Sequence, residues 1–513
     1  MDAMSSTGKT ASAKRSGGRR IQVAATVTVA LGLCLAYAYA VPAAAGSPAK
    51  AISSKDTSVS AATEVCPIVI GASQDSMAAF TPASGDNAPG SATVTQMGGP
   101  ATALATLKTP GSFGAAQNLS GAITNLKGES LPLVGQAKGG LAPGFTLDGV
   151  LESGAAGTEA YGLAAAACAE PDTGFWYIGA GTDANPVAQL NLADTDSLTA
   201  QIDVAEYNSG GLMSGNDQSV NQGVVVQAGG QANPPGLLID PNQTSPGAIA
   251  VHVTATTGRV TSQLLTGDSK GGGQDFIQSQ VPATSLVIPG IPAPPSGTTM
   301  KLQLMLMATT QDADVTLKWV GNSTFTPSVT VPHLSAGHVQ TVDISSIPSA
   351  GESGALEIDS TGGTPIIGAI KVTQTAGGSS DSAYLTPVAA LAGDSVVAVN
   401  RAGSSVILTN EGARPAQVRI TTTTQSGTTP PTTADKTVTV PAKSSSAQAL
   451  TAPAGSTTFA ITVTPLDGAS QVYAARVMTG TGPLITIQPM YTALESVLIP
   501  PVRADMSGTV PQN

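Results

Sequence analysis

Two alternating strands joined by a polar turn recur along this chain at a fixed offset, and this repeat constrains the fold more than any other feature. In the first copy, Leu192 is followed eight residues later by Ala200, and in another copy Leu408 is followed by Ala416 at the same distance. A looser copy occupies residues 304–317. Apolar and polar residues alternate on both sides of each turn, as is typical of strands with one buried face. Each copy therefore predicts a β-hairpin.

Further alternating strands follow each predicted hairpin. They are expected at residues 248–253, 355–358 and 459–463. Strands at this spacing, without helical periodicity, are typical of antiparallel β-sandwiches of immunoglobulin-like size. We therefore expect an all-β protein with three tandem immunoglobulin-like sandwiches, at residues 172–270, 298–376 and 395–490.

The composition agrees with a globular β protein. Only 11% of the residues are charged and 3% are aromatic, whereas 41% are hydrophobic. The 58 Gly and 36 Pro residues supply the many turns that short strands need. Because 33 acidic residues outnumber 22 basic ones, the chain lacks the cationic surface that binding to phosphate requires. Nucleic acid is therefore not expected as a partner.

An uncharged stretch, residues 21–45, follows a basic leader at residues 1–20. It is long enough to cross a hydrocarbon core of about 30 Å as a helix, and the leader would stay in the cytoplasm by the positive-inside rule. Small-x-small patterns at 38–40 and 43–45 also allow cleavage by signal peptidase. Two outcomes stay open: a retained transmembrane anchor, which makes the membrane a partner, or a cleaved signal and a secreted protein. In both, the rest of the chain lies outside the cell.

The segments outside the predicted sandwiches are expected to differ in how well ordered they are. Residues 46–62 have the composition of a flexible stalk. Residues 63–171 are predicted to be a β-rich, loop-heavy N-terminal region, and residues 491–513 a tail that is disordered after Pro500.

Two of the three cysteines, Cys66 and Cys168, lie in the exterior part. An even pair outside the cell predicts a disulfide, which would tie the N-terminal region to the first predicted sandwich. A metal site is disfavoured because neither residue has a His or acidic cluster around it. Cys34 is expected to be a small apolar residue within the span.

The residues that could carry catalysis form no recognisable constellation. The histidines are His252, His333 and His338, and their spacing matches no zinc motif. We expect His333 and His338 to be exposed loop residues. Ser47 and Lys50 have a Ser-x-x-Lys spacing, but they lie in the stalk without the companion motifs of penicillin-interactive enzymes. We therefore expect no enzyme activity and no cofactor.

Two acidic pairs and one aromatic strand have a structural and a functional interpretation. Asp194 with Asp196, and Asp312 with Asp314, fall in the predicted hairpin turns, where Asp is favoured because it bonds its own backbone. Calcium is the functional alternative, but the Gly and distal Glu of a calcium loop are absent. The strand at 175–178, Phe-Trp-Tyr-Ile, is expected to pack in a core or at an edge, with a sugar platform as the alternative. No metal site is predicted.

Several short motifs are spread along the chain. They are Cys66-Pro67, the Trp-Tyr-Ile-Gly at 176–179, the Ala-Val-His-Val-Thr at 250–254, Gly-Arg-Val at 258–260 and the Val-Pro-x-x-Ser strands. Together these motifs resemble an uncharacterised domain family of secreted or membrane-anchored envelope proteins from high-GC Gram-positive bacteria. The resemblance covers roughly residues 64–480 and implies no established activity or catalytic residue. Some relatives carry a label connecting them with organic-solvent-resistance transporter permeases, although this chain has one candidate span where a permease has several.

Two function hypotheses follow. We favour a non-enzymatic envelope protein whose tandem sandwiches form a scaffold or binding module at the cell surface, with envelope proteins or glycans as partners. The alternative is a single-span accessory subunit of a membrane transporter or envelope glycosyltransferase system. A cleaved signal would remove the helix on which the alternative depends.

Overall fold

The structure, a computed structural model, describes most of the chain between residues 55 and 499. In these ranges no helix has the length and apolar character needed to cross a membrane. The basic leader, the apolar segment 21–45, most of the stalk and the tail after residue 499 lie outside the described residues. The described ranges are 55–66, 74–82, 88–97, 105–107, 132–153, 161–183, 185–213, 220–232, 247–268, 270–322, 324–327, 329–331, 333–348, 351–424, 431–454, 456–467 and 471–499.

The described chain is all-β, as the sequence predicts, and the strands within its modules pair antiparallel. Its one helical turn in the described ranges is η2 (Thr361–Gly363). Residues 58–497 form one compact unit, and within it the sheets fall into four pairs, which we call the first, second, third and fourth modules.

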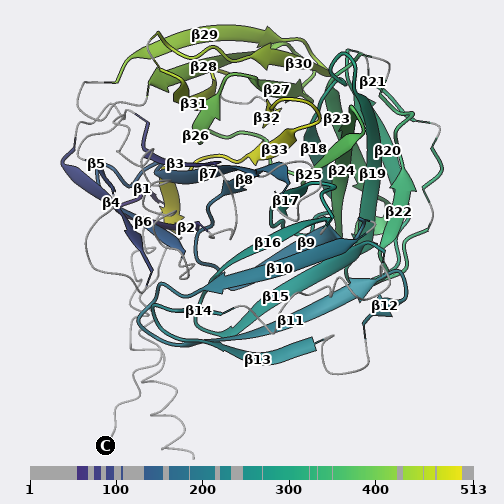
Figure 1. Ribbon diagram of the computed structural model, residues 1–513, viewed down its shortest axis with the longest axis horizontal. Coiled ribbons are helices and arrows are strands. Elements are labelled where there is room, and N and C mark those ends of the chain that lie inside the picture. Colours follow the sequence, from purple (N-terminus) through teal and green to yellow (C-terminus); the bar gives the residue numbers. More distant parts are fainter. Residues whose placement is uncertain are drawn as a thin grey trace, which may run out of the picture. The chain divides into compact units, whose positions relative to one another are not determined.

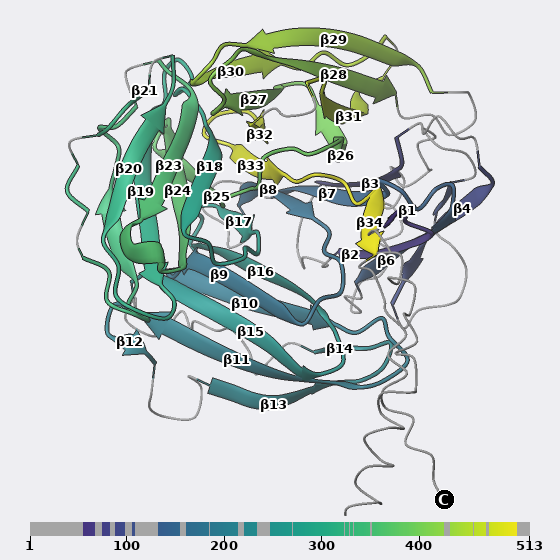
Figure 2. The ribbon, with the colours of Figure 1, turned by 180° about the vertical axis from the view of Figure 1, so that it is seen from behind.

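The second module illustrates the design. One sheet has the order β12-β11-β15-β9, with β13 also pairing with β11, and the other has the order β14-β10-β16-β17 (Figures 1 and 2). Tyr177, Leu192 and Ile202, from both sheets, belong to a single buried core. The strands are β9 (Gly174–Ala180), β10 (Pro186–Ala193), β11 (Ala200–Asn208), β12 (Gly211–Leu212), β13 (Val220–Val226), β14 (Gln231–Ala232), β15 (Ile249–Thr257), β16 (Thr261–Asp268) and β17 (Gln274–Ile277).

The third module has the sheet orders β18-β23-β20-β21 and β22-β19-β24-β25. Its core contains the buried Trp319. The strands are β18 (Ser285–Ile291), β19 (Thr299–Ala308), β20 (Val315–Val320), β21 (Thr324–Phe325), β22 (Gln340–Asp343), β23 (Gly354–Ser360), β24 (Ile366–Ala376) and β25 (Ser379–Leu385).

The fourth module has the orders β26-β31-β28-β29 and β30-β27-β32-β33. Leu408 and Phe459 lie in its core. The strands are β26 (Ser395–Arg401), β27 (Ser404–Asn410), β28 (Ala416–Thr424), β29 (Thr433–Val440), β30 (Ser444–Ala449), β31 (Thr458–Pro465), β32 (Val472–Thr479) and β33 (Ile485–Met490).

The first module follows the same plan. Its sheets have the orders β2-β6-β4-β5 and β3-β7-β8. The strands are β2 (Ala61–Cys66), β3 (Gln74–Phe80), β4 (Gly90–Gln96), β5 (Ala105–Leu107), β6 (Leu133–Gly139), β7 (Thr146–Ser153) and β8 (Gly162–Ala167).

One topology therefore recurs in all four modules. Counted without the two-residue β12, the first strand of the second, third and fourth modules pairs with the sixth, and the second pairs with the seventh, which in turn pairs with the eighth. The first module has the matching pairs β2 with β6, β3 with β7 and β7 with β8. We call the last strands of the modules, β8, β17, β25 and β33, the eighth strands. This order does not confirm the immunoglobulin-like arrangement, in which the first two strands share a sheet. The second module extends to β17, beyond its predicted end at residue 270. The third module runs from β18 to β25 and so extends beyond both ends of the predicted range 298–376.

The predicted hairpins need a correction. The strands exist, and Ala200, Ile202 and Val204 alternate into the core as expected. However, β10 and β11 belong to different sheets, as do β19 and β20, and β27 and β28. Each connection crosses the sandwich instead of closing a hairpin. Alternation shows which face of a strand is buried, but strands facing one core from opposite sheets alternate in the same way.

The eighth strands join the modules. β8 packs against β17 and β33, and β25 also packs against both. The structure joins Cys66 to Cys168 in a disulfide, with Cα atoms 4.4 Å apart, and Val65 forms an isolated bridge with Ala169 beside it.

The chain ends of the described part also pair. β1 (Lys55–Ser58) and β34 (Ser496–Ile499) form a two-stranded sheet. The last four described residues of the predicted tail are therefore a strand.

Candidate binding pocket at the module junction

Three buried carboxyl groups, one from each of the first three modules, lie where the eighth strands meet. Asp148, Asp275 and Asp381 are at most 1% exposed. Each accepts hydrogen bonds from another module, so these carboxyls hold the modules together. We call them the junction carboxyls.

The junction carboxyls accept hydrogen bonds from the first and fourth modules. Asp381 Oδ2 accepts from the backbone N–H groups of Leu163 (3.1 Å) and Ile485 (2.9 Å). Asp275 accepts from the Ala165 N–H (3.0 Å) and the Thr486 hydroxyl (2.9 Å). These bonds satisfy donors on the edge strands β8 and β33. The carboxyls therefore have a structural role, because a buried donor without a partner costs about 1–3 kcal/mol.

The fourth module contributes a buried cation. Arg476 is fully buried, and its Nη2 donates to Gln488 Oε1 at 2.5 Å. Burial lowers the pKa of Arg476 to about 10. Burial raises the pKa of Asp148 to about 6 and that of Asp275 to about 8, although both interact with Arg476. The pKa of Asp381 is also raised well above its usual value by burial.

A pocket of about 600 Å³ opens beside this junction. Most of its walls come from the segments that follow the eighth strands: residues 168–172 after β8, 278–283 after β17 and 387–389 after β25, with Tyr491 after β33. We call it the junction pocket. Because four modules supply its walls, it exists only in the assembled unit.

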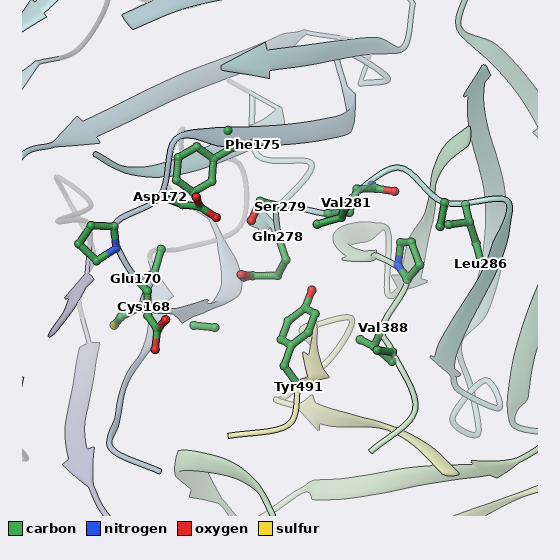
Figure 3. A pocket seen from close by; sticks show the side chains of 18 of the residues that line it. Cys168, Glu170, Asp172, Phe175, Gln278, Ser279, Val281, Leu286, Val388 and Tyr491 are labelled. Atoms are coloured by element: carbon green, nitrogen blue, oxygen red, sulfur yellow. The ribbon is translucent and has the colours of Figure 1, made fainter. Parts of the chain in front are cut away.

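The junction pocket has an acidic side and an aliphatic side (Figure 3). Glu170 and Asp172 lie on one side, whereas Leu286 and Val388 lie on the other. Tyr491 projects between them. Burial raises the pKa of the Glu170 carboxyl, and the neighbouring charge of Asp172 raises it further.

One lining side chain has an unused donor. Gln280 is 7% exposed, and its Oε1 accepts the backbone N–H of Gly368 at 2.9 Å. That bond fixes the orientation of the amide. The Gln280 Nε2 meets no acceptor in the described part of the chain.

The acidic pairs noted in the sequence have protein partners. Asp194 Oδ1 accepts the N–H of Asp196 at 2.8 Å, the turn geometry expected for Asp, and Arg259 forms an ion pair with Asp196. Asp314 and Asp312 both contact His333, whose pKa they raise. Among the described residues, no group of three or more His, Cys, Asp or Glu is placed to hold a metal ion.

The histidines are dispersed. His333 is exposed, as expected for a loop residue, whereas His338 is half-buried and lies where a Cβ on Gly211 would meet it. His252 stacks on Trp176, with ring centroids 3.8 Å apart. Ser47 and Lys50 lie outside the described residues.

The aromatic strand divides between two faces. Phe175 and Tyr177 are buried in the core of the second module, and the Tyr177 hydroxyl donates to the Ser262 carbonyl at 2.7 Å. Trp176 is half-buried on the other face and tilts against Tyr207. Packing therefore accounts for this strand.

The sequence did not identify the junction pocket. Of its lining residues, Cys168 was singled out for the disulfide and Phe175 as part of the aromatic strand, and neither was connected with a pocket. No motif connects the lining residues before the modules come together.

Fold and pocket together define a class: an all-β protein of tandem two-sheet modules with a pocket at their junction. The chain belongs to the family of unknown function DUF5719, which matches residues 115–453. This agrees with the uncharacterised family expected from its motifs. No curated protein and no solved structure is significantly similar to the chain.

Proposed function

We propose that this protein is a non-enzymatic binding scaffold of the cell envelope, working on the outer side of the cytoplasmic membrane. The observation that carries the proposal is the junction pocket, whose walls come from four modules that hold one another through buried carboxyls. A multi-module assembly with a preformed pocket suits the binding of a ligand or the placing of a partner.

The chemistry of the pocket favours binding over catalysis. The polar side chains among its described lining residues are two carboxyls, a phenol, two amides and two serine hydroxyls. No nucleophile with an adjacent base stands out among them. Envelope proteins or glycans are the partners that such a scaffold would take. The acidic balance of the chain argues against nucleic acid.

The location rests on the basic leader and the uncharged stretch at 21–45. The test is to add protease to intact cells that express the full chain, after removal of the cell wall. We expect degradation of the chain, with a cytoplasmic marker protein left intact. Complete protection of the chain would contradict the proposal.

Mass spectrometry of the mature N-terminus distinguishes the anchored form from the secreted form. A retained segment would keep the accessory-subunit hypothesis open, since its helix could dock in the bilayer. Cleavage after residue 40 or 45 would exclude that hypothesis and leave the scaffold.

A further inference from the structure

We propose that the junction pocket binds a small organic cation, an ammonium group attached to an apolar body. This inference rests on the proposed binding function and adds the chemistry of the ligand. It follows from the size of the pocket, the charge on one side and the apolar surface on the other.

The size selects a small molecule. Pockets of roughly 300–1,000 Å³ enclose most of the surface of a drug-sized ligand, and the junction pocket holds about 600 Å³.

The charge selects a cation. Glu170 and Asp172 are the charged residues among the described lining residues, and both are acidic. The Arg259 guanidinium, which interacts with Asp172, is already paired with Asp196 at 2.8 Å. An ammonium group placed between the two carboxyls would relieve their mutual repulsion, because an opposite charge within about 4–6 Å favours the ionised form.

The opposite side selects an apolar body. Val281 is 83% exposed although it lines the pocket, and Leu286 and Val388 stand on the same side as seen in Figure 3. Burying apolar surface releases about 25 cal/mol per Å², so a ligand covering Val281 gains affinity at no conformational cost to the core.

Three probes with one indole body test the charge. They are tryptamine (cationic), tryptophol (neutral) and indole-3-propionate (anionic), titrated into the full-length protein by calorimetry. We expect saturable one-to-one binding of tryptamine and binding weaker by about tenfold for tryptophol, since a hydrogen bond to a charged group contributes about 1.5–3 kcal/mol. The anion should not bind.

Variants locate the site. The double variant E170Q/D172N should weaken tryptamine binding by at least about tenfold. The control variant is D435N, which removes an exposed carboxylate of the fourth module that does not line the pocket. It should leave binding unchanged, which would show that tryptamine is not attracted merely by the overall negative charge of the protein. V281K should abolish binding by placing an ammonium group in the pocket, whereas V281Q, of similar length and no charge, should retain most of it.

Thermal unfolding of each variant checks that the fold is kept, and Val281 is too exposed for its replacement to disturb the core. Equal affinity for the three probes, or binding unaffected by both E170Q/D172N and V281K, would overturn the cation assignment. Tighter binding of the neutral or anionic probe would also contradict the cation assignment, but it would still agree with the proposed binding function. The envelope location is tested separately by protease accessibility, so the two proposals can fail independently.

Discussion

Asp148 and Gln488 are separated by 340 positions in the sequence, yet Gln488 Nε2 donates to Asp148 Oδ1 at 2.8 Å. The second oxygen of the same carboxyl accepts the Ala398 N–H at 2.5 Å. Both donors belong to the fourth module, so one buried side chain ties the first module to the last. The strands β8, β17, β25 and β33 also pack against one another. The first and fourth modules are therefore in direct contact, although they lie at opposite ends of the described chain.

Replacing Asp148 with Ala should therefore destabilise the whole unit. The change leaves the Gln488 amide and the Ala398 N–H buried without an acceptor, at about 1–3 kcal/mol for each donor. We expect a loss of about 2–5 kcal/mol in the free energy of unfolding, measured with urea. D435N, at an exposed position, is the control. An unchanged free energy of unfolding would show that the junction carboxyl does not join the modules.

The junction carboxyls also predict how stability changes with pH. Burial raises the pKa of Asp275 to about 8 and that of Asp148 to about 6, so the folded state binds protons that the unfolded state has released. Stability is then full below the ordinary Asp pKa and is lost as the pH rises through the folded-state values. The unfolding temperature should fall from about pH 5 to about pH 9.

The variant D275N tests the origin of this slope. An Asn at this position can still accept from Ala165 through Oδ1, and its amide can donate to the Thr486 hydroxyl. Because Asn does not titrate, the fall in unfolding temperature between about pH 6 and about pH 8 should become smaller than in the parent protein. A stability that rises over this range in the parent would contradict the assignment.

Much of the architecture could be predicted from local patterns. Leu192 and Ala200, like Leu408 and Ala416, are buried where alternation placed them. The partner of each strand could not be predicted, because β10 and β11 face the same core from opposite sheets. The sequence also did not predict that the first module is a two-sheet module like the others. Its strands contain few large apolar residues, and β8, for example, is Gly-Leu-Ala-Ala-Ala-Ala.

The junction was harder to foresee for a different reason. A lone Asp, such as Asp275 in the four-residue strand β17, normally indicates a turn. It is accommodated in the interior only because strands from other modules supply its donors. Glu170 and Val281 likewise acquire a common role only when segments from several modules meet. Such relationships depend on long-range packing that no local pattern records.

The disulfide gives a third prediction. Cys66 and Cys168 are 102 residues apart, and closing a loop of that length restricts the unfolded chain by about 4–5 kcal/mol in the chain-entropy model. Peptide mapping without reductant should find the two cysteines linked, and the double variant C66S/C168S should unfold at lower urea concentration. Two free thiols in protein isolated without reductant would contradict the pairing.

The fourth prediction tests the sandwich cores with a matched pair of leucines. Leu192 is 1% exposed in the second module, whereas Leu198, six residues later in the connection to β11, is 75% exposed. Replacing Leu192 with Asp forces a carboxyl into the core, which costs several kcal/mol, and should unfold the second module; L408D should do the same in the fourth. Replacing Leu198 with Asp should leave the urea transition unchanged within about 0.5 kcal/mol. Because the modules contact one another through their eighth strands, we also expect L192D to expose the neighbouring modules to limited proteolysis. Resistance of L192D equal to that of L198D would show that the alternation does not mark the core.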